Sequence, residues 1–166
     1  MPRHSSFFND LILGALAGGA AVWAMDKLDQ ALYDAEPAES RRMPASANAS
    51  GLDKAHVIAS KAAAAVGATL DPDQVSPAGI AVHYGAGALM GGLYGAFRRR
   101  LPLLDAVHGT GFGLLVYSLQ AEGLNTALST GGRPSNNLWQ ANARQFIAHG
   151  FYGLVTDTIL RVLGRH

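Results

Sequence analysis

Two histidines and two carboxylates lie in or next to four long, nearly uncharged stretches of the chain. Their side chains are suited to acid–base chemistry. Each stands inside or at the edge of a long stretch that is otherwise almost free of charge: Asp26, His83, Glu122 and His149. Histidine titrates near neutral pH, and burial can shift a carboxyl group towards the same range. These four residues are therefore candidates for a cluster that relays protons or handles an ion.

The same side chains are compatible with other roles. Histidine nitrogens and carboxylate oxygens bind first-row transition metals, and two histidines on different helices can hold a haem iron axially. The simplest alternative is that each histidine donates one hydrogen bond and locks helices together, because buried polar groups must be paired. We predict no cofactor, and keep a transition metal and haem as alternatives.

The stretches that must position these residues have the length of membrane spans. Four nearly uncharged segments come close to the roughly 20 residues that cross a hydrocarbon core: 7–25, 77–97, 103–121 and 145–163. None has a polar stripe at every third or fourth residue, as a helix facing water would. We predict an all-α fold, a four-span transmembrane helical bundle in a single domain over 1–166. A compact glycine-rich soluble bundle is the alternative.

Charge between the segments predicts their orientation. The short link between the second and third segments contains three consecutive arginines, 98–100, and short arginine-rich links face the cytoplasm. Both termini then lie inside, and the segment 122–144 faces outward.

At ~1.5 Å per residue, His83 would lie about 9 Å below the outer surface, and His149 at a similar depth. Asp26 and Glu122 would close their spans at that surface, which is why the four side chains should converge. A looser second group would lie on the inner side: Asp105, His108 and Asp157.

The long segment after the first span should lie outside the membrane. Residues 35–50 are rich in Pro, Ala and Ser, which is typical of a flexible linker. Residues 52–70 have apolar positions at helical spacing and predict an amphipathic interfacial helix, which Asp71-Pro72-Asp73 would end. The first span resembles a signal peptide in some respects, but we expect it to be a retained anchor.

Glycines recur at four-residue spacing within three of the segments. Such spacing lets helix backbones approach closely in a membrane. The glycines expected to pack helices in this way are Gly14, Gly18, Gly87, Gly91, Gly95, Gly109 and Gly113. Helices of this kind pack with a partner protein or with a second copy, and the lipid bilayer is the other expected partner.

Composition argues against several classes of function. The chain has no Cys, a net charge of +1 and only 15% charged residues, against about 25% in soluble domains. No basic block is long enough to bind nucleic acid. No metalloprotease, nucleophile-elbow or phosphate-loop motif occurs, so we predict that the protein is not an enzyme.

Short motifs along the chain are similar to those of one known family. They are Trp23-Ala24-Met25-Asp26, His83 followed by Tyr94-Gly95, Pro102, Glu122-Gly123-Leu124 and His149-Gly150-Phe151-Tyr152-Gly153. With these motifs the chain resembles the uncharacterised bacterial inner-membrane family that includes YagU. In the loop before the last span, the family often has an additional His that this chain lacks. The resemblance implies a small four-helix protein of the bacterial inner membrane, with a link to acid tolerance.

Together these features predict a small polytopic inner-membrane protein of non-enzymatic type. It would pack with a partner complex or with itself and serve envelope or acid-stress tolerance. The alternative is a protein that handles protons, ions or a metal through the outer His and carboxylate cluster.

Overall fold

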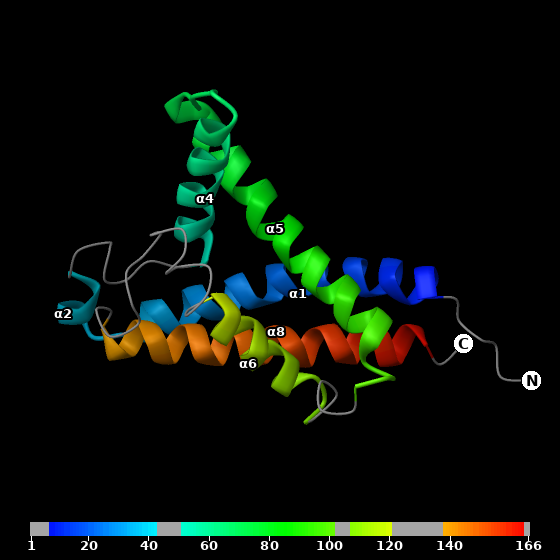
Figure 1. The fold of residues 1–166 in the computed structure, drawn as a ribbon. Coiled ribbons are helices and arrows are strands. Elements are labelled where there is room, and N and C mark those ends of the chain that lie inside the picture. Colours follow the sequence, from blue (N-terminus) through cyan, green and yellow to red (C-terminus); the bar gives the residue numbers. More distant parts are fainter. Residues whose placement is uncertain (1–6, 43–50, 102–106, 121–137, 165–166) are drawn as a thin grey trace, which may run out of the picture.

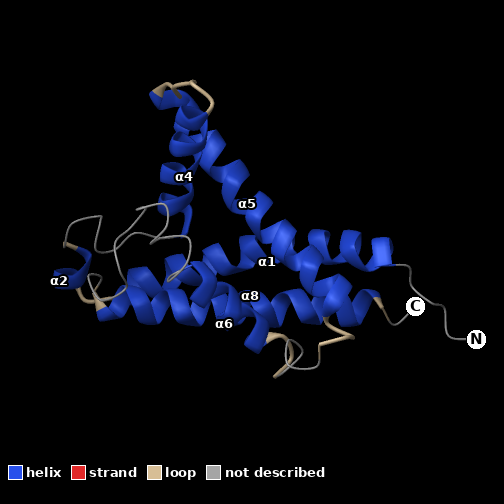
Figure 2. Ribbon diagram, viewed as in Figure 1, coloured by secondary structure: helices blue, strands red, loops and turns tan. Residues whose placement is uncertain are grey.

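All regular structure in the described part of the chain is helical. The computed structural model describes residues 7–42, 51–101, 107–120 and 138–164. No strand occurs in these ranges, so the prediction of an all-α fold is confirmed for them (Figure 2). The helices are α1 (Phe7–Ala35), α2 (Ala38–Arg41), α4 (Gly51–Ala65), α5 (Pro72–Phe97), α6 (Thr110–Ser118) and α8 (Trp139–Leu163).

Two of the three long helices, α1 and α8, lie side by side and run in opposite directions (Figure 1). The second half of α5 crosses the first half of α1, and its other half projects away with α4 folded back against it. The short helix α6 packs on α8. The hydrophobic core lies where α1, α5, α6 and α8 meet and consists of Ala17, Ala21, Val22, Met25, Tyr94, Phe112, Ala148, Tyr152 and Leu160.

Glycine permits the close crossing of α1 and α5. A Cβ atom added to Gly14 would overlap the carbonyl oxygen of Gly91, and one added to Gly18 would overlap that of Gly87. A Cβ on Gly95 would overlap the backbone of the first turns of α1. The two backbones are therefore in direct contact over about two turns, as small residues at four-residue spacing permit.

A second glycine contact joins α6 to α8. A Cβ on Gly113 would overlap the carbonyl oxygen of His149, and Gly109 and Gly153 approach each other's backbones in the same way. Gly109 also has a φ of 78°, a left-handed conformation that side chains rarely adopt. This glycine turns the chain immediately before α6 begins.

Several helix boundaries differ from those expected from the sequence. α1 continues ten residues past position 25, and α2 lies inside the expected linker 35–50. α4 ends at Ala65 rather than at 70, because Gly67 follows with a left-handed φ of 75°. Asp71 does not end that helix but begins the next: its backbone N–H donates to Gln74 Oε1 (3.0 Å), and Pro72 occupies the first turn, where no backbone N–H is needed.

The last two segments also differ from expectation at their starts. α6 begins at Thr110, seven residues after the expected start at 103, because of the turn at Gly109. Part of the expected segment, 102–106 and 121, lies outside the described residues. α8 begins at Trp139, six residues before the expected start at 145, since its polar first turns are held by contacts with α1.

Among the described residues, one helix is long and apolar enough to cross a membrane. This helix is α1, with 29 residues and a mean hydropathy of 1.4 in its most apolar part. α5 and α8 have 26 and 25 residues, but glycine and polar side chains dilute their hydropathy. They have the length of a span, but neither has a stretch of that length as apolar as the one in α1.

Candidate functional site

Asp26 on α1 and His83 on α5 form a hydrogen-bonded pair. His83 Nε2 lies 2.9 Å from Asp26 Oδ1, so the imidazole N–H donates to the carboxylate. The Asp26 side chain is 33% exposed and the His83 side chain only 10%. The carboxylate thus faces solvent, while the imidazole lies between the helices.

His149 on α8 lies deeper and is bonded at both ring nitrogens. Its Nδ1 is 2.8 Å from the Gln145 carbonyl oxygen, which can only accept, so Nδ1 carries a proton and donates. Its Nε2 is 3.0 Å from Gln120 Oε1. An amide side chain presents either its oxygen or its NH2 group, so Gln120 can partner His149 in both protonation states.

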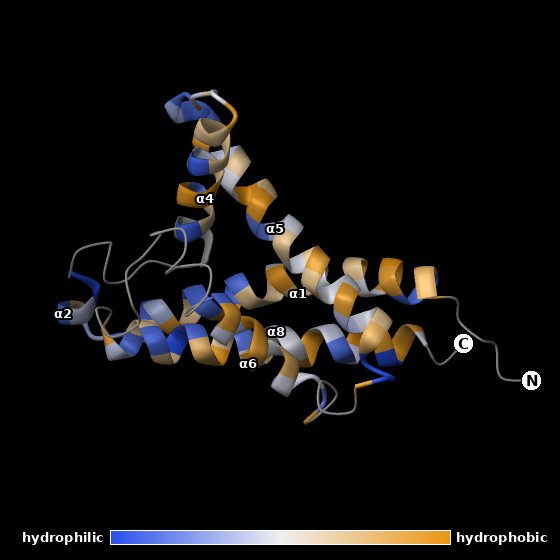
Figure 3. Ribbon diagram, in the orientation of Figure 1, coloured by the Kyte–Doolittle hydropathy of each residue, from blue (hydrophilic) through white to orange (hydrophobic). Residues whose placement is uncertain are grey.

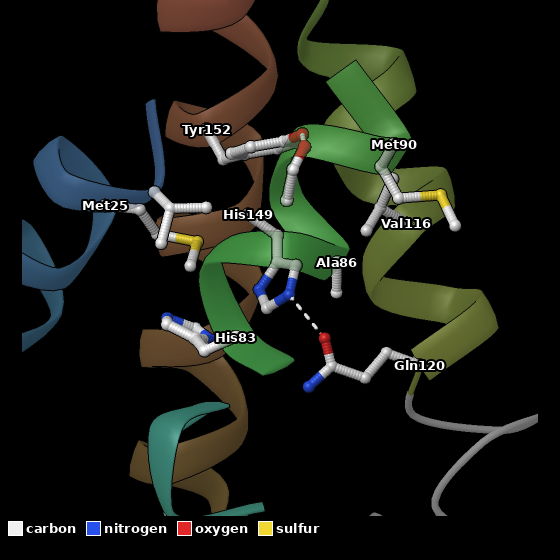
Figure 4. A pocket seen from close by; sticks show the side chains of 10 residues that line it. Met25, His83, Ala86, Met90, Val116, Gln120, His149 and Tyr152 are labelled. Carbon is white, nitrogen blue, oxygen red and sulfur yellow. Dashed lines mark hydrogen bonds between the residues drawn. The ribbon is translucent and has the colours of Figure 1, made fainter. Parts of the chain in front are cut away.

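The two histidines line one cavity, which we call the histidine cavity (Figure 4). His149 lies at its centre, between Met25 and His83 on one side and Met90 and Val116 on the other. Its volume is about 70 Å³. At roughly 30 Å³ per molecule of liquid water, this space holds about two waters. A larger space of about 190 Å³ adjoins it, shares His83 and Gln120 in its lining, and extends to Lys54 on α4.

The structure describes three of the four predicted cluster residues and places them near one another. Asp26 and His83 are in contact, and His149 shares a cavity with His83. Glu122 lies outside the described residues. No group of three or more His, Asp or Glu residues in the described ranges could hold a metal ion, so the metal alternative gains no support from them.

Of the predicted inner group, the structure describes His108 and Asp157. Asp105 lies outside the described residues, and His108 is exposed in the turn before α6 with a φ of 52°. Asp157 is fully buried instead and binds other partners: it accepts hydrogen bonds from Tyr94 Oη (2.9 Å) and Arg98 (2.8 Å) and also from Arg161. This carboxylate ties the end of α5 to the end of α8.

A third polar cluster, at the opposite end of the bundle, was missed in the sequence. The Arg144 side chain is 3% exposed and donates to Asp29 (3.0 Å) and Glu36 (2.8 Å) on α1. Its guanidinium also lies 4.9 Å from the centre of the Tyr33 ring. Burial raises the pKa of the Asp29 carboxyl above its ordinary value, and the charge of Arg144 opposes that shift.

One signal in the sequence could have revealed this cluster. Asp29 and Glu36 are seven residues apart, so they share a face if the helix continues past the apolar stretch. Arg144 precedes the last apolar stretch by one residue and would face them in an antiparallel neighbour. Figure 3 shows this hydrophilic end of α1 and α8 opposite the hydrophobic start of α1.

The polar groups continue along one face of α8. Its buried side contains Arg144, Gln145, His149, Thr156 and Asp157, and its exposed side contains Phe146, Ile147, Leu154, Val162 and Leu163. α8 thus turns these polar side chains towards the other helices, beside buried apolar ones such as Ala148, Tyr152 and Leu160, and turns mostly large apolar side chains towards the outside.

No protein-family model, no characterised protein and no solved structure matches this chain. The site is therefore interpreted from its own residues and geometry.

Proposed function

We propose that this protein is a small multi-pass protein of the bacterial inner membrane, of non-enzymatic type. The observation that carries the proposal is the polarity of α8. Its buried face holds an arginine, a histidine and an aspartate, whereas large apolar side chains on its other face are 38–55% exposed. A helix in water favours the reverse arrangement, and a hydrocarbon surrounding favours this one.

The exposed face of α1 supports the same proposal. Phe8, Ile12, Leu16 and Trp23 follow one another at four or seven residues, which places them on one side of the helix, and they are 56–71% exposed. The opposite side consists of Gly14, Ala17, Gly18 and Ala21 and packs against α5 and α8. At ~1.5 Å per residue α1 is about 43 Å long, so its apolar first part fills a 30 Å core and its acidic end projects beyond it.

The positions of the helix ends agree with both termini lying on the cytoplasmic side. The Phe7 and Phe97 rings lie 5.8 Å apart, which brings the start of α1 to the end of α5. Arg98 joins the end of α5 to Asp157 near the end of α8. These three ends therefore lie together beside the arginines at 98–100, as the positive-inside rule predicts. In the proposed topology the chain returns across the membrane between α5 and α8, where the described helix α6 has nine residues and covers about 14 Å of the core.

Partition between membrane and water tests this proposal directly. The expressed chain should sediment with membranes, stay there after an alkaline carbonate wash and need detergent for extraction. Recovery in the aqueous supernatant as a folded monomer would refute it.

In mild detergent, a pull-down should recover a second copy or a partner, since glycine-lined helices pack closely. A lone monomer would count against a packing role.

A second candidate function, within the same membrane protein, is proton handling by the histidine cavity. It rests on the exposed Asp26 carboxylate bonded to His83, and on His149 in the same water-sized cavity. A proton taken up at Asp26 would pass to His83 and from there to His149, and both histidines are titratable side chains. Such a device would suit a role in acid or envelope stress. Proton uptake by liposomes that contain the protein, compared with empty liposomes, tests it.

A further inference from the structure

A groove at the outer end of the bundle, which we call the Glu36 groove, lies apart from the histidine cavity. It is formed by the end of α1, the start of α2 and the first turns of α8, and its volume is about 260 Å³. Its walls are mostly apolar and include Leu32, Pro37, Trp139 and Ile147. Two polar side chains, Glu36 and Gln140, complete the lining together with Arg144.

Two oxygen atoms at this groove are buried without a hydrogen-bond partner. They are Glu36 Oε2 and Gln140 Oε1. The Glu36 side chain is only 9% exposed, and its other oxygen binds Arg144 at 2.8 Å. Gln140 donates its NH2 group to Ser40 Oγ (3.1 Å), which leaves its oxygen unused. A buried acceptor that lacks a donor is costly, so a ligand with N–H groups would be favoured here.

The charges around the groove favour a cation. The carboxylates of Asp29 and Glu36 both bind the guanidinium of Arg144, so the cluster holds two carboxyl groups beside one guanidinium. Trp139 lines the groove and is 73% exposed, and an aromatic side chain of this kind attracts a cation placed over its ring.

We propose that the Glu36 groove binds a primary ammonium group attached to an apolar body. The ammonium would donate to Glu36 Oε2 and Gln140 Oε1, and the attached chain would lie against Leu32 and Ile147. A primary ammonium has three N–H donors, whereas a quaternary ammonium has none and leaves both oxygens unpaired. The ammonium can come from the headgroup of an ethanolamine phospholipid or from a water-soluble amine.

Titration of the full chain in mild detergent distinguishes these sources. Of the two tryptophans, Trp23 can be replaced (Trp23→Phe), so that the fluorescence of Trp139 reports on the groove alone. The probes are dihexanoyl phosphatidylethanolamine, dihexanoyl phosphatidylcholine and ethanolamine. We expect saturable binding of the ethanolamine lipid and binding of the choline lipid that is weaker by about tenfold or more, the value of one charge-assisted hydrogen bond. Equal binding of ethanolamine itself would identify the water-soluble amine as the source.

Two substitutions of matched charge test the role of Glu36. Glu36→Gln should weaken binding by about tenfold or more, whereas Glu39→Gln, which removes the same charge from an exposed position nearby, should leave it unchanged. Gln140→Glu places a carboxylate at the second unpaired oxygen and should strengthen binding. This gain does not depend on whether the Glu36→Gln variant folds.

Three results would overturn the proposal. They are the absence of saturable binding of either primary amine, equal binding of the ethanolamine and choline lipids, and equal effects of Glu36→Gln and Glu39→Gln in folded protein. If the Glu36→Gln variant does not fold, unchanged or weaker binding in the Gln140→Glu variant would overturn it instead.

Discussion

His83 Nε2 and Asp26 Oδ1 lie 2.9 Å apart although 57 residues separate them in the sequence. The pair lies one helical turn from the glycine crossing of α1 and α5. Gly87 follows His83 by four residues, and a Cβ at Gly87 would overlap the Val22 side chain, four residues before Asp26. The absence of a side chain at Gly87 therefore lets α5 approach α1 closely enough for the imidazole to reach the carboxylate.

Loss of the His83 imidazole from this pair should abolish the proposed proton uptake. His83→Ala should lower uptake by liposomes to the level of empty vesicles, because it removes the titratable group between Asp26 and the histidine cavity. His108→Ala is the matched control: this histidine is exposed in a turn outside the cavity, and its loss should leave uptake unchanged. Liposomes with the unmodified protein that take up protons no faster than empty ones would eliminate this candidate function.

The glycine crossing makes a prediction with an internal control. Gly14→Ala should destabilise the protein by about 1–3 kcal/mol, because the new Cβ meets the backbone carbonyl of Gly91 and one helix must move. Gly19→Ala should stabilise it by up to ~1 kcal/mol, since that position has open space and alanine favours a helix. Thermal unfolding in detergent measures both, and similar shifts for the two variants would contradict the crossing.

The sequence predicts close packing on the glycine faces and the approach of Asp26, His83 and His149, because both depend on simple spacing, but it does not say which helices cross or which residues bond. Glycine at every fourth position marks one face of a helix, and shared depth in a four-span topology brings Asp26 near His83 and His149. The Arg144 cluster was missed for an equally physical reason: hydropathy ends the first segment at residue 25, although α1 continues to Ala35. The partners that stabilise this polar extension lie more than 100 residues away, on α8.

Loss of the buried Asp157 carboxylate should be strongly destabilising. Asp157→Ala leaves the largely buried Arg98 guanidinium without its partner, and breaking a buried ion pair in this way costs about 3–5 kcal/mol. Asp34→Ala, at an exposed position on α1, should change stability by less than about 0.5 kcal/mol. Unfolding in denaturant compares the two. Equal losses would show that Asp157 does not tie α5 to α8.

The raised pKa of Asp29, beyond the apolar part of α1, predicts a pH dependence of stability. Its ordinary value is 3.8, and burial raises it in the fold despite the charge of Arg144. The stability that this group contributes is complete below the ordinary value and is lost as the pH rises through the raised pKa. Between about pH 4 and pH 7, the Tm of the unmodified protein should therefore fall relative to that of Asp29→Asn. A relative rise would show that the attraction of Arg144 outweighs burial.

The sequence does not predict where α6 begins. The start of α6 at Thr110 depends on left-handed backbone at Val107, His108 and Gly109, and only the glycine favours that conformation. A continuous apolar stretch conceals this turn, because hydropathy does not report backbone dihedral angles. His108 is consequently exposed in this turn, although its neighbour Gly109 lies against Asp157.

The topology can be measured directly, because the chain contains no cysteine. Single cysteines are placed at two exposed positions, Thr69→Cys between α4 and α5 and Leu101→Cys after α5. Each variant is labelled in intact spheroplasts with a membrane-impermeant maleimide. The proposed four-span arrangement predicts labelling at position 69 without lysis and at position 101 only after lysis. Labelling of both positions from the same side would contradict it.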